Sequence, residues 1–68
     1  MIYAVDIYGK AEREFTTLAA AQSWSEERAA GYYARRVDYY IEVLYNRGSI
    51  SYFSDSDGKP IKHICTYI

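Results

Sequence analysis

The feature that most constrains the fold of this chain is an alternating stretch near its middle. Between residues 37 and 45 the side chains repeat with a period of two, which is typical of a β-strand. One face of this predicted strand contains Val37, Tyr39, Ile41, Val43 and Tyr45. We interpret the stretch as the central strand of a sheet, with this face directed toward the core.

A second strand is predicted at the N-terminal end. Residues 2–8 are rich in β-branched and aromatic side chains, and Gly9 and Lys10 then give a turn signal. Residues 11–15 form either a short return strand or an irregular segment, because Glu12 and Glu14 weaken the strand pattern.

A helix is predicted to follow. Thr16 and Thr17 offer an N-cap, the alanines after them favour helix, and Trp24 is expected to seal the helix onto the sheet. Glycine is the residue most often found just past a helix end, so Gly31 predicts a helix ending near Ala30. In the alternative, the helix continues to Arg35 and glycine inside it costs roughly 1 kcal/mol.

The last third of the chain predicts two more strands. Residues 46–49 form a turn signal, and residues 50–54 return along the central strand with Val43 opposite Tyr52. Residues 55–58 give a second turn, and residues 61–68 a final strand. The core-facing positions expected on that strand are Ile64, Thr66 and Ile68.

These elements predict an α+β fold: one helix packed on one face of a four- or five-stranded antiparallel sheet. Their order is strand, optional short strand, helix and three strands. Sixty-eight residues are expected to form a single compact domain over residues 1–68. One helix covers one face of such a sheet, so the other face is expected to be bare.

Composition and motifs argue against several functions. Cys65 is the sole cysteine, which excludes a disulfide framework and a thiolate zinc site, and suits a reducing cytoplasm. His63 and Cys65 have no third group to orient them, and no catalytic or phosphate-binding motif is present. We therefore expect a cytoplasmic protein that is not an enzyme and uses no cofactor or metal. No apolar run reaches the roughly 20 residues of a membrane span, and the first residues do not resemble a signal peptide.

Tyrosine and arginine indicate where a partner binds. Nine of the 68 residues are tyrosine, more than a core of this size can bury completely, and five of the nine lie between residues 32 and 45. Both residue types are enriched in interface hot spots. The predicted partner-binding residues are Arg28, Tyr32, Tyr33, Arg35, Arg36, Tyr40 and Phe53. The alternative interpretation is a connection whose tyrosines cap the core and whose arginines are solvated.

The order of elements, with the helix entry Phe15-Thr16-Thr17-Leu18-Ala19-Ala20-Ala21, resembles small phage-encoded inhibitor proteins of the anti-CRISPR and host-takeover types. The resemblance covers the whole chain but lies in layout and length. It implies that the chain binds a host protein or ribonucleoprotein complex, such as a CRISPR effector, and blocks it sterically. No residue role follows from it.

Two other functions stay open. The first is a small nucleic-acid-binding or regulatory module that acts through the sheet face with Tyr40, Phe53, Arg47 and Lys62. A net charge of −1 makes this function less favoured than protein binding. The second is a structural homodimer, formed by edge-strand pairing or by the bare sheet face.

Overall fold

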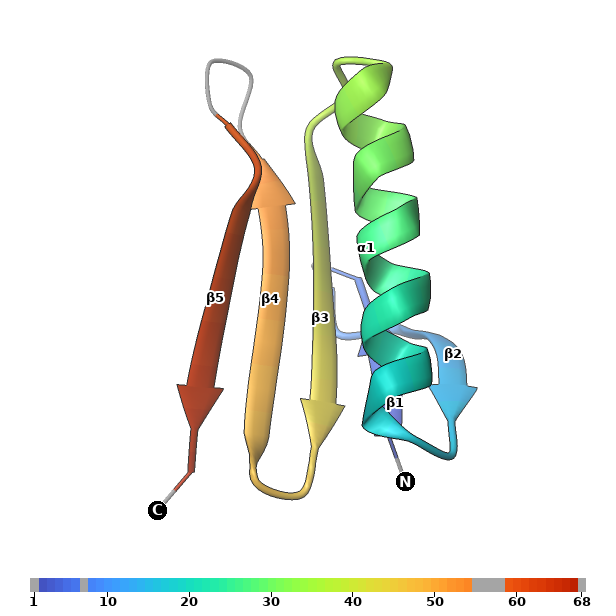
Figure 1. The fold of residues 1–68 in the computed structure, drawn as a ribbon, viewed down its shortest axis with the longest axis vertical. Helices are drawn as coiled ribbons and strands as arrows, with labels where there is room; N and C mark the ends of the chain where they lie inside the picture. Colours follow the sequence, from blue (N-terminus) through green and yellow to red (C-terminus); the bar gives the residue numbers. More distant parts are fainter. Residues whose placement is uncertain (1, 7, 55–58, 68) are drawn as a thin grey trace.

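The computed structural model describes residues 2–6, 8–54 and 59–67. It contains a five-stranded antiparallel sheet with one helix lying across one face (Figure 1). The strands run in the order β2-β1-β3-β4-β5, so β3 is central. Along the chain the elements are β1 (Ile2–Val5), β2 (Ala11–Phe15), α1 (Leu18–Ala34), β3 (Tyr39–Tyr45), β4 (Gly48–Ser54) and β5 (Ile61–Thr66). The predicted α+β fold is confirmed, and residues 11–15 are a strand.

The turn between β1 and β2 is organised by the side chain of Asp6. Its Oδ1 accepts hydrogen bonds from the backbone N–H groups of Tyr8 and Lys10, both at 2.9 Å. Gly9 has a φ of 78°, a conformation that glycine adopts without steric cost. Beyond the turn, the pairing of β1 with β2 shifts register between Ala4 and Val5, which places a bulge in this hairpin.

The helix begins as predicted and ends later than predicted. The Thr17 side chain accepts a hydrogen bond from the N–H of Ala20 at 3.2 Å, which caps the N-terminus. The helix then passes through Gly31 and ends at Ala34, so the expected end near Ala30 is wrong. The N–H groups of Arg36 and Val37 bond back to the carbonyls of Tyr33 and Tyr32, and Arg36 has a φ of 56°. This is a Schellman motif with arginine where glycine is usual.

Packing beyond Gly31 explains the longer helix. The extra turn brings Tyr32 over Tyr39, with the two rings stacked at a centroid distance of 5.9 Å. Tyr39 is itself buried, and Tyr32 packs against the core. An aromatic pair contributes about 0.5–1.5 kcal/mol beyond the area it buries. That gain, together with the burial, offsets the roughly 1 kcal/mol that glycine costs inside a helix.

The hairpin between β3 and β4 has a different register from the predicted one. Its turn has two residues, so Tyr45 pairs with Gly48 and Val43 with Ile50 rather than with Tyr52. The predicted strand is displaced by two positions, which leaves each side chain on its expected face. Gly48 does not have a positive φ. A Cβ at Gly48 would instead overlap the carbonyl of Cys65 on β5, so glycine permits the close approach of that strand.

The core lies between α1 and the middle of the sheet. The buried face of the helix consists of small residues one turn apart, Ala21, Ser25 and Ala29. They let the helix approach β3, where Ile41 and Val43 are completely buried. Trp24 packs the helix onto the sheet as predicted, but at the β2 side and only partly buried, with its ring 5.7 Å from that of Phe15.

The sequence predicted more buried residues than the structure has, both just before β3 and on β5. Val37 precedes β3 and is 48% exposed, because the chain is still completing the end of the helix there. On β5, Ile64 and Thr66 pair with Ile50 and Gly48 and therefore lie on the helix side, as predicted. They are nevertheless exposed, because α1 packs on β1 to β4 and does not reach β5. The predicted turn at residues 55–58, and Ile68, lie outside the described residues.

The two glycines offer a matched test of this account. We expect Gly31→Ala to raise the free energy of unfolding by about 0.5–1 kcal/mol, because a Cβ at Gly31 meets open space inside a helix. We expect Gly48→Ala to lower it by about 1–3 kcal/mol, since the added methyl meets the backbone of β5. Urea denaturation of both variants measures the difference. Equal effects would contradict the assigned roles.

Candidate protein-interaction surface

The structure places the seven predicted partner-binding residues in three areas. Arg28, Tyr32 and Arg35 lie together along one side of α1, and Arg36 follows the helix end with its side chain exposed. Tyr33 lies on the side of the helix that faces β4 and β5. The remaining two, Tyr40 and Phe53, stack on each other at 6.0 Å on the sheet face opposite the helix. The predicted set is therefore not one site.

The first area is a column in which arginines alternate with aromatic rings. The Arg35 guanidinium lies 5.1 Å from the centre of the Tyr32 ring, and Arg28 lies between Tyr32 and Trp24 at 5.5 and 5.1 Å. Arg13 on β2 continues the column, at 6.0 Å from Trp24 and 5.5 Å from Phe15. We call Arg13, Trp24, Arg28, Tyr32 and Arg35 the arginine column. Its members Arg13 and Trp24 were not among the predicted partner-binding residues.

The arginine column is positively charged in a protein that is slightly acidic overall. It holds three guanidinium groups, and in the described part of the chain the one ion pair that they form joins Arg28 to Glu12 at 3.4 Å. The Nε of Arg35 donates a hydrogen bond to the Gly31 carbonyl at 3.2 Å, which fixes the direction of that side chain. All three arginines are exposed beside the rings, so guanidinium N–H groups can still reach a partner. Those N–H groups are the donors that bind carboxylates and phosphates in pairs.

The second area is a groove between the helix and β5, about 320 Å³ in volume. Glu26 lies on one side of this groove, where its carboxylate links α1 to β4 and β5. Its Oε2 accepts hydrogen bonds from the Tyr52 hydroxyl at 2.9 Å and from the Lys62 ammonium at 3.2 Å. The Lys62 ammonium also lies 5.7 Å from the centre of the Tyr52 ring. The sequence pattern contains no signal for these contacts, because the partners Tyr52 and Lys62 lie 26 and 36 residues away from Glu26.

These contacts change the acidity of both partners. The hydrogen bonds from Tyr52 and Lys62 lower the pKa of Glu26 below its ordinary value of 4.5, because they stabilise the carboxylate. Burial raises the pKa of Tyr52, and the nearby Glu26 carboxylate raises it further. Tyr52 therefore stays a neutral hydrogen-bond donor throughout the physiological range.

The third area is the sheet face away from the helix. Tyr3, Tyr40, Leu44 and Phe53 lie on it around Glu42, and the Tyr40 hydroxyl lies 3.5 Å from the Glu42 carboxylate. Lys62 is not part of this face. It pairs with Tyr52 on the helix side, so the predicted nucleic-acid surface loses one of its two cations. A carboxylate among the aromatic rings further disfavours a phosphate backbone there.

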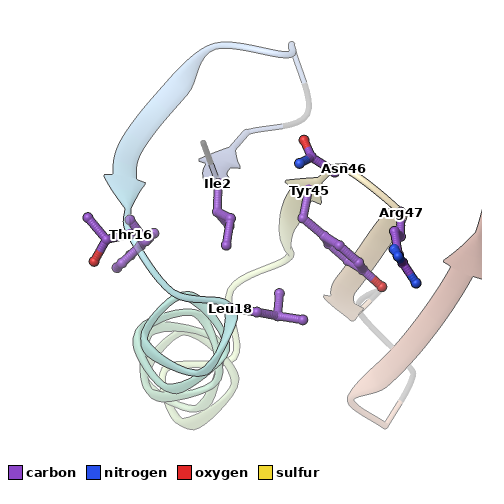
Figure 2. Close-up of a pocket in the computed structure, with 7 residues that line it drawn as sticks. Ile2, Thr16, Leu18, Tyr45, Asn46 and Arg47 are labelled. Atoms are coloured by element: carbon purple, nitrogen blue, oxygen red, sulfur yellow. The ribbon is translucent and has the colours of Figure 1, made fainter.

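A separate pocket of about 590 Å³ lies at the opposite end of the helix from Arg36. Figure 2 shows Ile2, Leu18 and Tyr45 pointing into it, with Thr16, Asn46 and Arg47 around them. No carboxylate, histidine or cysteine is found among its described lining residues.

Within residues 2–6, 8–54 and 59–67 there is no cluster of three or more His, Cys, Asp or Glu side chains suited to a metal ion. The helix in this part of the chain is not long and apolar enough to cross a membrane. No family model, curated protein or solved structure matches the chain.

The Glu26 contacts predict a pH dependence. Because folding lowers the pKa of Glu26, its contribution to stability is present above the unfolded pKa near 4.5 and is lost as the pH falls through the folded pKa. We expect Glu26→Gln to lower the free energy of unfolding at pH 7 by up to about 1 kcal/mol, because the carboxylate is largely exposed. The difference from wild type should shrink toward pH 3.

Urea denaturation between pH 3 and pH 7 checks this dependence. Glu27→Gln is the matched control, because it removes the neighbouring exposed carboxylate, for which no contact with the described residues is found. A gap between wild type and Glu26→Gln that stays constant with pH would contradict the role of the carboxylate.

Proposed function

We propose that this chain is a small non-enzymatic protein-binding module whose arginine column contacts an acidic surface of its partner. The single observation behind the proposal is the alternation of Arg13, Arg28 and Arg35 with Trp24 and Tyr32. The rings hold the guanidinium groups in place before binding. Less side-chain entropy is therefore lost on association than with free arginines.

The charge balance of the column points toward an acidic partner. Three guanidinium groups face one paired carboxylate, Glu12, in a chain of net charge −1. Tyrosine and arginine supply most of the energy in known hot spots when they are desolvated together. A partner that offers two or three carboxylates at similar spacing would receive paired hydrogen bonds from these arginines.

The backbone conformation and the exposed side chain of Arg36 also support the proposal. It has a φ of 56°, which costs a residue with a side chain about 1–2 kcal/mol relative to the right-handed region. Its side chain is exposed. The Schellman motif accounts for the left-handed backbone, and arginine in place of the usual glycine adds an exposed cation next to Arg35 of the arginine column.

The narrower proposal is a phage or mobile-element inhibitor that sterically blocks a host nucleic-acid machine such as a CRISPR effector complex. It rests on the resemblance in layout and length to small phage-encoded inhibitors. In this proposal the arginine column binds an acidic patch beside the basic nucleic-acid path of such a machine, and the bound module obstructs that path.

Substitution of the column arginines tests the protein-binding proposal. With the tagged protein as bait, partners captured from a bacterial lysate are identified, and the affinity for a purified partner is then measured. We expect Arg28→Ala and Arg35→Ala each to weaken binding by about 10- to 30-fold, a loss of about 1.4–2 kcal/mol. Both residues are exposed, so the fold should be retained.

Arg47→Ala is the matched control. It removes the same charge at an exposed position outside the column and should leave the affinity within about threefold of wild type, the effect of a rim charge. Equal losses in all three variants would show a general charge effect and contradict the column. Tight binding of single-stranded oligonucleotides that weakens steeply with salt would favour the nucleic-acid alternative.

Arg36 gives a separate prediction. We expect Arg36→Gly to raise the free energy of unfolding by about 1 kcal/mol, because glycine adopts a φ of 56° without strain, and to weaken partner binding. Arg36→Ala should weaken binding equally but leave stability nearly unchanged. Denaturation and affinity measured on both variants test this, and unchanged affinity would remove Arg36 from the binding surface.

A further inference from the structure

The two edges of the sheet differ in how well they are protected. The outer strand β2 has the sequence Ala-Glu-Arg-Glu-Phe, and its pairing with β1 contains a bulge. Charges and bulges are the devices that prevent edge strands from pairing with other chains. The other outer strand, β5, pairs regularly with β4 over all six residues from Ile61 to Thr66. Its one lysine, Lys62, points back toward Glu26 and Tyr52.

The exposed apolar side chains collect at the β5 edge. Of the six large hydrophobic residues that are exposed in the described part of the chain, three lie on or beside β5. These are Ile61, Ile64 and Tyr67, with exposed fractions of 45%, 56% and 55%. An edge strand with regular pairing, few charges and exposed apolar residues is a site for pairing with a further strand.

The hydrogen-bonding pattern fixes which residues face outward. The N–H of Tyr67 donates to the Arg47 carbonyl at 2.8 Å, so odd-numbered residues of β5 direct their backbone groups toward β4. In an antiparallel ladder the direction alternates, so Lys62, Ile64 and Thr66 direct theirs to the open edge. Pro60, just before the strand, has no N–H to offer.

We propose that β5 pairs antiparallel with β5 of a second copy of this chain, in the register that places Ile64 opposite its own symmetry mate. This register is symmetric about the three outward-facing residues Lys62, Ile64 and Thr66. Their donors and acceptors bond to the same three residues of the second copy. The dimer has a twofold axis perpendicular to the sheet, and the two five-stranded sheets become one of ten strands.

Side chains fit this register better than the register centred on Lys62. Lys62 lies opposite Thr66 of the second copy, so like charges do not meet, whereas a register centred on Lys62 would oppose two ammonium groups. Ile64 covers Ile64 on the helix side of the sheet. On the opposite face Ile61 covers Tyr67. The three exposed apolar residues of this edge are therefore covered in one arrangement.

A disulfide cross-link tests the register. In the proposed register, residue 63 lies opposite Cys65 of the second copy in a non-hydrogen-bonded pair. The Cα atoms of such a pair are about 4.5 Å apart, a distance that a disulfide spans. We expect His63→Cys to form a covalent dimer under mild oxidation. The wild-type protein, which has Cys65, and the control variant Ile61→Cys should each form at least tenfold less covalent dimer. Their nearest cysteines are diagonal neighbours about 7–8 Å apart, which is too far for a disulfide.

Sedimentation of the unlinked protein tests the dimer itself. When its concentration is raised to several hundred micromolar, the wild-type protein should sediment as a dimer, with twice the 7.9 kDa mass of one chain. Ile64→Lys, which opposes two ammonium groups on the axis, should raise the dissociation constant about tenfold or more. Ile61→Lys meets Tyr67 instead and should have a smaller effect. Circular dichroism confirms that both variants fold.

Three results would overturn the proposal. A wild-type protein that stays monomeric over the whole concentration range excludes the dimer. Equal effects of Ile64→Lys and Ile61→Lys, or a dimer that neither variant changes, place the interface elsewhere. Covalent dimer formed equally by His63→Cys and Ile61→Cys, or a disulfide confined within one chain, excludes this register.

Discussion

The structure depends on one geometric constraint: a single helix has to cover a sheet of five strands. A helix with its side chains is about 10–12 Å wide, whereas five strands at about 4.8 Å spacing span about 19 Å. The stripe of Ala21, Ser25 and Ala29 meets this constraint by bringing α1 close to the completely buried Ile41 and Val43. The Ser25 hydroxyl is buried and finds no hydrogen-bond partner among the described residues, which shows that small size matters more than polarity there.

Both proposed binding surfaces lie at or beyond the border of the area of the sheet that the helix covers. On the β2 side, Trp24 and Tyr32 are too large for the narrow contact and lie at its border, where arginines cover their rings. On the β4 side, Tyr52 lies at the edge of the core and its hydroxyl donates a hydrogen bond to Glu26 of the helix. β5 lies beyond the strands on which the helix packs, is linked to the helix by the Lys62–Glu26 ion pair, and keeps its apolar side chains exposed. Partner binding by the arginine column and pairing of β5 with a second copy thus both use regions that a single helix leaves uncovered.

The sequence predicted the features that local pattern determines and failed where packing decides. Alternation identified β3 and its buried face, and the threonine cap identified the helix start. Propensity placed the helix end at Gly31, because the stacking of Tyr32 on Tyr39 is not visible in a local pattern. That error also hid the column: Trp24, Arg28, Tyr32 and Arg35 are spaced by four, four and three residues, which is one helix face only if the helix continues through Gly31.

The arginine column and the β5 edge lie on opposite sides of the helix, as the strand order in Figure 1 shows, and this separation makes the two proposals compatible. A twofold axis perpendicular to the sheet keeps both helices on the same face of a ten-stranded dimer. The two columns then lie near its outer ends, about 40 Å apart at the usual strand spacing. A partner with two acidic patches at that distance would be held by both columns, and the second contact would form at a high effective concentration. A chain of 68 residues would thereby bind more tightly than the few arginines of one copy allow.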